Sequence, residues 1–141
     1  NRDELILKRL NQKEESRDEI ILIEKIDLSE NQTIINLENT IESIEEINKI
    51  FTWDFDAEKI TLPLKLRRIQ EGDIFYPIGF SGKKKVSKFF RDEKLSILAK
   101  QKIWLLTDGN DSVLGIIPFR QDRRYSKDEK TKNILTIFNE K

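Results

Sequence analysis

The alternation of apolar and polar residues predicts a chain built mainly from short β-strands. Apolar or alternating runs of strand length occupy residues 4–10, 19–26, 32–37, 51–55 and 59–62. Pro63 confines the last of these runs to an edge or an end of a sheet, because proline has no N–H to donate. Residues 103–107 and 112–117 flank the turn-forming residues 108–111 and predict a β-hairpin. Residues 133–138 predict a closing strand, with a frayed helix as the alternative.

Other segments predict helices and a long loop. Residues 39–50 place isoleucine at every third position from 41 onward, which gives one apolar stripe on a helix. Residues 86–94 carry three apolar side chains at helical spacing with basic residues between them, and residues 95–100 add a further helical turn. Glycine and proline punctuate residues 72–82, which predicts a loop. The expected fold class is α+β, mainly antiparallel β with a few short helices.

Composition excludes several kinds of chemistry. The 141 residues include no His, Cys or Met, which excludes a disulfide, a thiol nucleophile, a thiolate or imidazole zinc site and an imidazole general base. No apolar stretch approaches the ~20 residues needed to cross a bilayer, and no signal-peptide pattern is present. We therefore expect a cytoplasmic protein with no membrane partner. The lack of an initiator Met predicts a fragment of a longer protein.

The zero net charge hides an uneven distribution of acidic and basic residues. Of the 26 basic and 26 acidic side chains, residues 1–60 hold 8 and 16, which leaves 18 and 10 for residues 61–141. This asymmetry predicts an acidic, β-rich linker or subdomain over residues 1–58 and a basic C-terminal domain over residues 59–141. It favours a polyanion as the partner of the basic part.

The positive charge is concentrated in one short segment. Residues 83–91 contain five basic side chains and no acidic one, and the predicted helix exposes Lys85, Lys88 and Arg91 opposite its apolar side. A rigid row of cations is suited to phosphates at fixed spacing, which supply affinity but little sequence information. The alternative is a merely solvated helix face. The absence of a compensating acid favours the polyanion site.

Two arginine clusters extend this basic surface. They are Arg67 with Arg68, and Arg120 with Arg123 and Arg124. Arginine binds phosphate through paired N–H groups and stacks on bases. One of these arginines is expected to pair with Asp73 or Asp122 inside the protein, so not all of them are free.

Other sites with chemical potential are weaker candidates. The glycine- and lysine-containing run of residues 79–84 lacks the spacing of a Walker A loop, and the dinucleotide-binding pattern is missing from the sequence. Asp54 and Asp56 would share one face of a strand, but a paired general acid and base needs apolar burial. A solvated strand end is the favoured interpretation. Trp53 and Trp104 lie within apolar alternation and are interpreted as core residues.

Several segments of the basic part, taken in order, resemble one protein family. They are residues 64–68 (LKLRR), 71–79 (EGDIFYPIG), 82–95 (GKKKVSKFFRDEKL), 104–106 (WLL), 115–120 (GIIPFR) and 122–125 (DRRY). The ordered set over residues 62–138 resembles the C-terminal domain of tRNA(Ile)-lysidine synthetase, also called tRNA(Ile)-lysidine synthase. Residues 1–60 resemble the less regular segment that precedes this domain. The sequence Pro118-Phe119-Arg120 departs from the family, which commonly has glycine before the arginine that ends the hairpin.

The resemblance implies an enzyme that uses ATP to adenylate the wobble cytidine of the isoleucine tRNA with a CAU anticodon and then joins lysine to it. The catalytic ATP-pyrophosphatase domain of such enzymes, which takes ATP and Mg, carries an SGGxDS loop that this sequence lacks. The chain is therefore expected to be non-catalytic, to hold no cofactor or metal itself, and to bind tRNA at the acceptor stem.

The resemblance and the charge pattern together give a set of expected tRNA contacts. These are Arg67, Arg68, Lys83, Lys84, Lys85, Lys88, Arg91, Arg120, Arg123 and Arg124, with the last three arginines in the same groove as the lysines. The other expected partner is the enzyme's own N-terminal catalytic domain, and a homodimer is left open. The alternative is a protein-interaction or dimerisation module whose acidic half packs against a catalytic domain or a second subunit without touching RNA.

Overall fold

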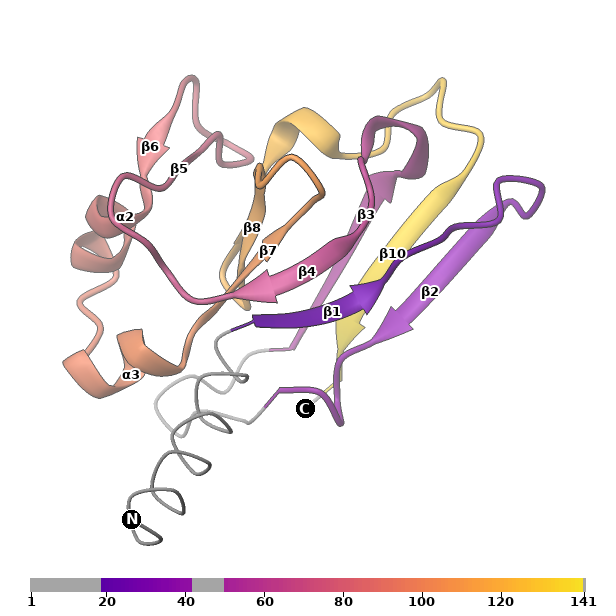
Figure 1. Cartoon of the computed structure of the whole chain (residues 1–141). Helices are drawn as coiled ribbons and strands as arrows, with labels where there is room; N and C mark the ends of the chain where they lie inside the picture. Colours follow the sequence, from indigo (N-terminus) through magenta and orange to yellow (C-terminus); the bar gives the residue numbers. More distant parts are fainter. Residues whose placement is uncertain (1–18, 42–49, 141) are drawn as a thin grey trace, which may run out of the picture.

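The computed structural model describes residues 19–41 and 50–140, which form two packed β-sheets with helices on one side (Figure 1). The first sheet has the strand order β1 (Glu19–Ile23), β4 (Leu64–Arg67), β7 (Trp104–Thr107), β8 (Val113–Ile117) and β9 (Arg120–Gln121), all antiparallel. The second has the order β2 (Gln32–Asn36), β10 (Ile134–Asn139) and β3 (Phe51–Asp56). In it, β10 runs parallel to β2 and antiparallel to β3.

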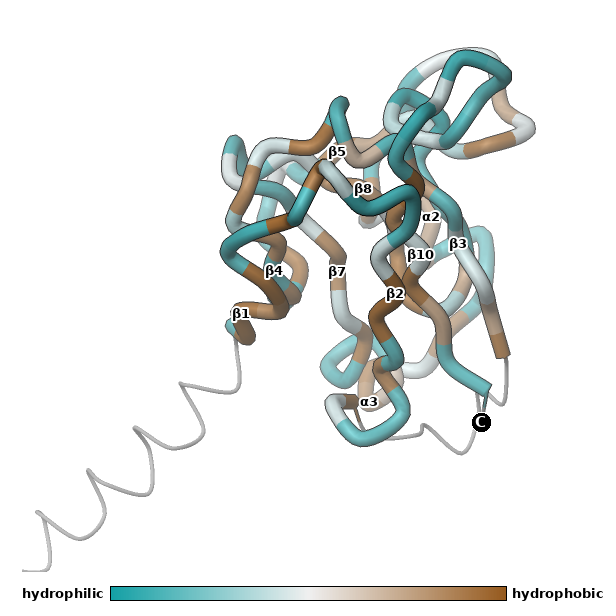
Figure 2. The backbone as a smooth tube through the Cα atoms, turned by 90° about the vertical axis from the view of Figure 1, so that its right-hand side faces the viewer, coloured by the Kyte–Doolittle hydropathy of each residue, from teal (hydrophilic) through white to brown (hydrophobic). Residues whose placement is uncertain are grey.

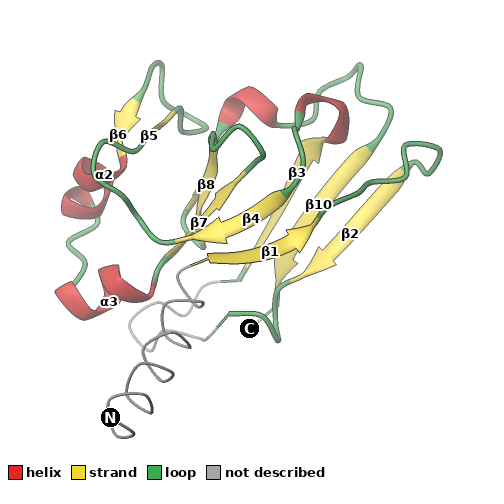
Figure 3. Cartoon of the chain, in the orientation of Figure 1, coloured by secondary structure: helices red, strands yellow, loops and turns green. Residues whose placement is uncertain are grey.

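The remaining elements are short and lie mostly beside the first sheet (Figure 3). They are the two-stranded pair β5 (Ile74–Phe75) and β6 (Lys84–Lys85), the helices α2 (Val86–Asp92) and α3 (Ile97–Lys102), and the 3-10 helices η1 (Ala57–Lys59) and η2 (Arg123–Tyr125). Within the described part of the chain, no helix is long and apolar enough to cross a membrane.

The first sheet separates two hydrophobic cores, because alternate side chains of a strand point to opposite faces. Trp104 and Leu106 of β7 face the second sheet, whereas Leu105 lies in the core beneath α2 and α3. Figure 2 shows the hydrophobic stretches along the strands and the hydrophilic ones in the connections. Gly115 in β8 lets the sheets approach closely, since a Cβ there would lie 2.5 Å from the ring of Trp53.

The structure confirms the fold class and most of the predicted elements. The strands expected within residues 19–26, 32–37, 51–55 and 133–138, the hairpin of residues 103–117 and the helices beginning at residues 86 and near 95 are all present. Trp53 and Trp104 are core residues, as predicted. The strand expected at residues 4–10 and most of the helix expected at residues 39–50 lie outside the described residues.

The strand expected at residues 59–62 is a wrong prediction. The strand begins after Pro63 and forms β4, which lies between β1 and β7 and not at an edge. Residues 60–62 contact a turn instead, because the Gly109 N–H donates to the Thr61 carbonyl at 2.6 Å. Leu64 and Leu66, both fully buried, hold β4 in the core between the sheets.

The acidic and basic parts of the sequence contribute strands to the same sheets. β1 pairs with β4, and β2 and β3 pair with β10 on its two sides. The residues on either side of position 58 therefore share one hydrophobic core, and the basic surface described next is built on a scaffold to which both parts contribute.

Candidate nucleic-acid interface

Basic side chains surround a surface pocket beside α2. The apolar residues Val86, Phe89 and Phe90 of this helix are buried in the second core, which fixes its basic face toward solvent. The pocket, of about 690 Å³, is lined by Ile74, Phe80, Lys83, Lys84, Lys85, Lys88, Arg91 and Asp92. We call it the lysine pocket. The structure thus brings together all five cations predicted in residues 83–91.

Within the described residues, four of the five cations in the lysine pocket make no side-chain hydrogen bond or ion pair. Lys84 is the exception, because its Nζ lies 2.6 Å from Asp92. The hydrogen bond from Lys84 holds the pKa of Asp92 below its ordinary value of 3.8, so that carboxylate stays ionised at neutral pH. The side chains of Lys83, Lys85, Lys88 and Arg91 are exposed and make no hydrogen bond or ion pair within the described residues, although the charges of Lys88 and Arg91 also help to lower the pKa of Asp92. Their charges are available to a polyanion.

Arg67 behaves differently, because its guanidinium is buried and fully bonded. It makes paired hydrogen bonds with Asp73 at 2.8 and 2.9 Å and donates to Asp111 at 2.8 and 3.4 Å and to the Arg68 carbonyl at 3.0 Å. These five bonds use all of its N–H donors. The hydrogen bond to Asp73 is the main cause that raises the pKa of Arg67. With a side chain only 5% exposed, it has no donor left for a phosphate.

Arg68 is also engaged inside the protein. Its guanidinium carbon lies 3.5 Å from the ring centroid of Trp104, and one of its N–H groups donates to the Ile103 carbonyl at 3.3 Å. Stacking of this kind is a cation–π contact. Arg68 therefore covers one side of the core tryptophan, on a different element from the lysine pocket.

The arginines after the hairpin are organised by Asp122, whose side chain is completely buried. Asp122 accepts hydrogen bonds from the backbone N–H of Tyr76 at 2.8 Å and from the backbone and guanidinium of Arg124 at 2.7–3.2 Å. Burial lowers the pKa of Arg124, but the hydrogen bond and the charge of Asp122 outweigh it and leave the pKa raised. Arg124 also lies over Tyr76, 4.1 Å from its ring centroid.

Arg120 and Arg123 contact the loop that borders the lysine pocket. Arg120 donates to the Ile78 carbonyl at 3.0 Å, and Arg123 donates to the Phe80 carbonyl at 3.2 Å. Both side chains are exposed, but neither they nor Arg124 line the pocket itself. The structure therefore places Arg120 and Arg123 against the backbone of Ile78 and Phe80, and Arg124 against Asp122 and Tyr76. The expectation that one arginine pairs with Asp73 or Asp122 is confirmed twice, by Arg67 and by Arg124.

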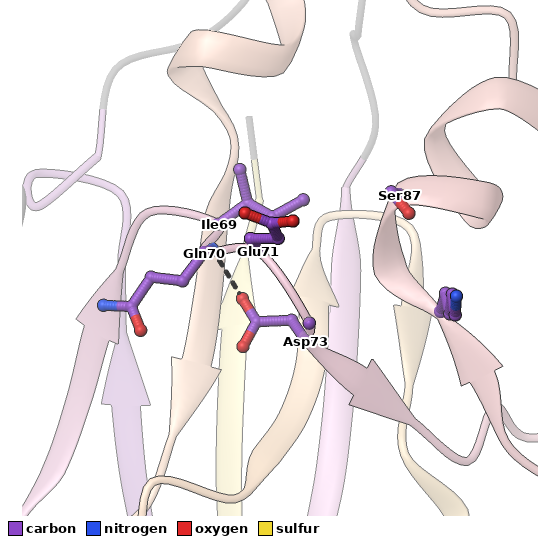
Figure 4. Close-up of a pocket in the computed structure, with 7 residues that line it drawn as sticks. Ile69, Gln70, Glu71, Asp73 and Ser87 are labelled. Carbon is purple, nitrogen blue, oxygen red and sulfur yellow. Dashed lines mark hydrogen bonds between the residues drawn. The ribbon is translucent and has the colours of Figure 1, made fainter.

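A second, smaller pocket shares Lys85 with the lysine pocket, and Figure 4 shows several of the residues that line it. Its volume is about 390 Å³, and its lining includes Glu71, Asp73, Lys85 and Ser87. Asp73 accepts a hydrogen bond from the Gln70 N–H at 2.7 Å in addition to its pairing with Arg67. Two carboxylates make this pocket a poorer match to phosphate than the lysine pocket.

The two strand-end carboxylates have structural partners. Asp54 accepts a hydrogen bond from Thr136 at 2.6 Å and lies 3.3 Å from Lys127, and Asp56 caps η1 through the Glu58 N–H at 3.0 Å. In the described residues, no group of three or more acidic side chains is placed to hold a metal ion.

Comparison with known proteins links the chain to the family that its motifs resemble. It is 37% identical over 114 residues to a tRNA(Ile)-lysidine synthase of Parabacteroides distasonis, and 40% identical over 81 residues to one of Bacteroides thetaiotaomicron. These matches cover 81% and 57% of the chain but 25% and 19% of the relatives, so the chain spans about a quarter or less of their length. No family model matches the sequence.

Solved structures supply the fold. The crystal structure of the TILS C-terminal domain, TILS being the short name of this synthase, matches with a TM-score of 0.54 at 20% identity, over 62% of this chain and 68% of that one. The predicted resemblance is confirmed. The chain is similar in sequence to tRNA(Ile)-lysidine synthases and has the β-rich fold of their C-terminal domain. An N-terminal fragment of the phenylalanyl-tRNA synthetase β-subunit from Pyrococcus horikoshii matches with a TM-score of 0.52 at 22% identity, over 64% of this chain and 28% of that one.

The contact residues predicted from the sequence did not include the aromatic residues beside the lysine pocket. Phe80 lines the lysine pocket, and Tyr76 lies beneath Arg124. Position in this loop does not by itself give a signal, because Phe75 of the same loop is completely buried in the second core whereas Phe80 is exposed.

Proposed function

We propose that this chain is the tRNA-binding C-terminal portion of a tRNA(Ile)-lysidine synthase. The lysine pocket carries the proposal, because four cations whose side chains make no hydrogen bond or ion pair within the described residues lie around one depression. The similarity to lysidine synthases over 81% of the chain supports it. In this proposal the domain grips the isoleucine tRNA with the CAU anticodon. A catalytic domain elsewhere in the enzyme uses ATP to join lysine to the wobble cytidine.

The chemistry of the pocket suits the backbone of a duplex stem. Lysine ammonium groups attract phosphates as point charges without reading bases. The deep major groove of an RNA helix hides its base edges, so duplex RNA is recognised mainly by shape and backbone. We therefore assign the lysine pocket to a stem of the tRNA, specifically the acceptor stem, and leave Arg67 and Arg68 out of the contact surface because both are engaged within the protein.

The proposal is tested by titrating this chain with three labelled RNAs at two salt concentrations. The RNAs are an isoleucine tRNA transcript, its isolated acceptor-stem hairpin and its anticodon-stem hairpin. We expect binding that weakens with salt, persists with the acceptor-stem hairpin and fades with the anticodon-stem hairpin. Equal binding of both hairpins would contradict the acceptor-stem assignment. Failure to bind any of the RNAs at low salt would overturn the proposal, and a salt-insensitive dimer that ignores RNA would favour the protein-interaction alternative.

A further inference from the structure

An exposed aromatic ring stands at the border of the lysine pocket. Phe80 is 47% exposed although it is one of the largest apolar side chains in the protein. The Nζ of Lys84 lies 5.7 Å from its ring centroid, and the ring lines the same pocket as the four unpaired cations. Phosphates would contact the cations and have no need of an aromatic ring. Phosphate binding alone therefore does not explain why Phe80 is exposed among these cations.

The backbone that carries Phe80 is held rigidly. The Phe80 N–H donates to the Pro77 carbonyl at 3.2 Å, which closes a turn over residues 77–80. Gly79 sits at the third position of that turn with a φ of +84°, a conformation for which glycine is suited. The turn therefore places Phe80 at the border of the lysine pocket.

Residues 120–123 hold this turn in place through hydrogen bonds. The Ile78 N–H donates to the Gln121 carbonyl at 2.9 Å, Arg120 donates to the Ile78 carbonyl at 3.0 Å, and Arg123 donates to the Phe80 carbonyl at 3.2 Å. Three hydrogen bonds from one segment thus fix two residues of the turn, Ile78 and Phe80. A side chain on such a support loses little conformational entropy when a ligand packs on it.

We propose that Phe80 is a stacking platform for an unpaired nucleobase next to the stem held by the lysine pocket, and that Arg120 and Arg123 are positioning residues for it. This inference rests on the proposed function. Aromatic rings beside a cationic groove stack on bases without sequence preference, because every base has a π-face. Paired bases within a stem expose their edges but not their faces, so the ligand of Phe80 is a base outside the duplex.

Three RNA hairpins with the same stem separate the platform from the phosphate contacts. One is blunt, one carries a four-nucleotide single-stranded extension, and one carries an abasic extension of equal length. For the wild-type chain we expect the base-bearing extension to strengthen binding about fivefold or more over the abasic one. Equal affinities for these two RNAs, with the extension tested at either end of the stem, would overturn the inference.

Variants of the chain assign the effect to Phe80. Phe80→Leu should remove the gain from the bases while leaving the salt dependence unchanged, and Phe80→Trp should retain the gain because it keeps an aromatic face. Leu98→Ala is the control, since Leu98 is 67% exposed on α3 and does not line the pocket. A gain that survives in Phe80→Leu would overturn the inference without touching the proposed function. Failure of the wild type to bind even the blunt hairpin would overturn both.

The positioning role has its own readout. Arg120→Gln and Arg123→Gln each remove a hydrogen bond to the turn that carries Phe80. Each should reduce the gain from the bases more than the affinity for the blunt hairpin. If either variant instead weakens binding to the blunt and base-bearing hairpins by the same factor, that arginine acts as a phosphate contact and its positioning role is overturned.

Discussion

Two arginines, Arg67 and Arg124, carry the same charge as the cations of residues 83–91 but stand in a different environment. Arg67 and Arg124 are held by Asp73 and Asp122, and the side chains of Asp73 and Asp122 are 10% and 0% exposed. In residues 83–91, by contrast, only Lys84 has an acidic partner, and Asp92 is exposed. Buried pairs use their charge to order the protein, whereas exposed cations keep theirs for a ligand. The comparison divides the basic surface into a scaffold and a contact surface.

The elements that present each group explain the difference. Arg67 lies on β4, in the interior of the first sheet, where a charge must find partners on neighbouring loops. Lys83 precedes β6, Lys84 and Lys85 form it, and Lys88 lies on the outer face of α2, whose inner face is occupied by Val86, Phe89 and Phe90. A short helix with one apolar face can point its remaining residues only toward solvent.

The largest expected effect is on stability, from removing the buried guanidinium. Arg67→Ala leaves Asp73 nearly buried without its partner, which should lower the free energy of unfolding by about 3–5 kcal/mol. The matched control is Arg91→Ala, an exposed arginine whose loss should change stability by no more than about 0.5 kcal/mol. Urea denaturation of both variants measures the difference. Similar stability losses would contradict the division between scaffold and contact surface.

A smaller loss of stability is expected at Asp122. In Asp122→Asn the amide keeps one acceptor oxygen but turns an N–H₂ group toward a guanidinium or a backbone N–H, so at least one charge-assisted bond to Arg124 is lost. We expect a destabilisation of about 1.5–3 kcal/mol, measured by the denaturation midpoint. Asp92→Asn is the control of identical chemistry at an exposed site, and a matching shift there would refute the special role of Asp122.

The smallest effect is expected on RNA affinity, from releasing Lys84. The pKa of Asp92 lies below its ordinary 3.8 because Lys84 hydrogen-bonds to it, so the stabilisation from this pair is present at neutral pH and is lost as the pH falls through that lowered pKa. Substitution is therefore the practical way to break the pair near neutral pH. Asp92→Asn should steepen the dependence of log affinity on log salt by at most about one. A shallower dependence would show that Asp92 supports binding.

The sequence predicted an element correctly wherever its local apolar pattern matches the side chains that are buried in the fold. The hairpin of β7 and β8 combines two buried apolar runs with a turn of favourable residues, and α2 has its apolar face at helical spacing. β6 and β9 were missed because two residues are too few to show a period. The strand placed at residues 59–62 failed because the backbone of Thr61 bonds to the turn at Gly109, a contact 48 residues away.

The residues of the candidate site likewise divide into those whose environment a local pattern predicts and those whose environment depends on distant contacts. The exposure of Lys85, Lys88 and Arg91 followed from helical periodicity, which is a local property. The pairing of Arg67 with Asp73, six residues away, was among the expected alternatives, but its second partner Asp111 lies 44 residues further along the chain, and no local pattern reports such a partner. The bracing of Phe80 by residues 120–123 is likewise a tertiary contact.

The central claim is that the exposed lysines beside α2, and not basic charge in general, bind the RNA backbone. It is tested most directly by the salt dependence of tRNA affinity in two triple variants that each remove three positive charges. One carries Lys83→Gln, Lys85→Gln and Lys88→Gln, and the other carries Lys127→Gln, Lys130→Gln and Lys132→Gln in an exposed loop. The account predicts that the slope of log affinity against log salt falls by about three in the first variant and stays near the wild-type value in the second. Equal slopes in the two variants would contradict it.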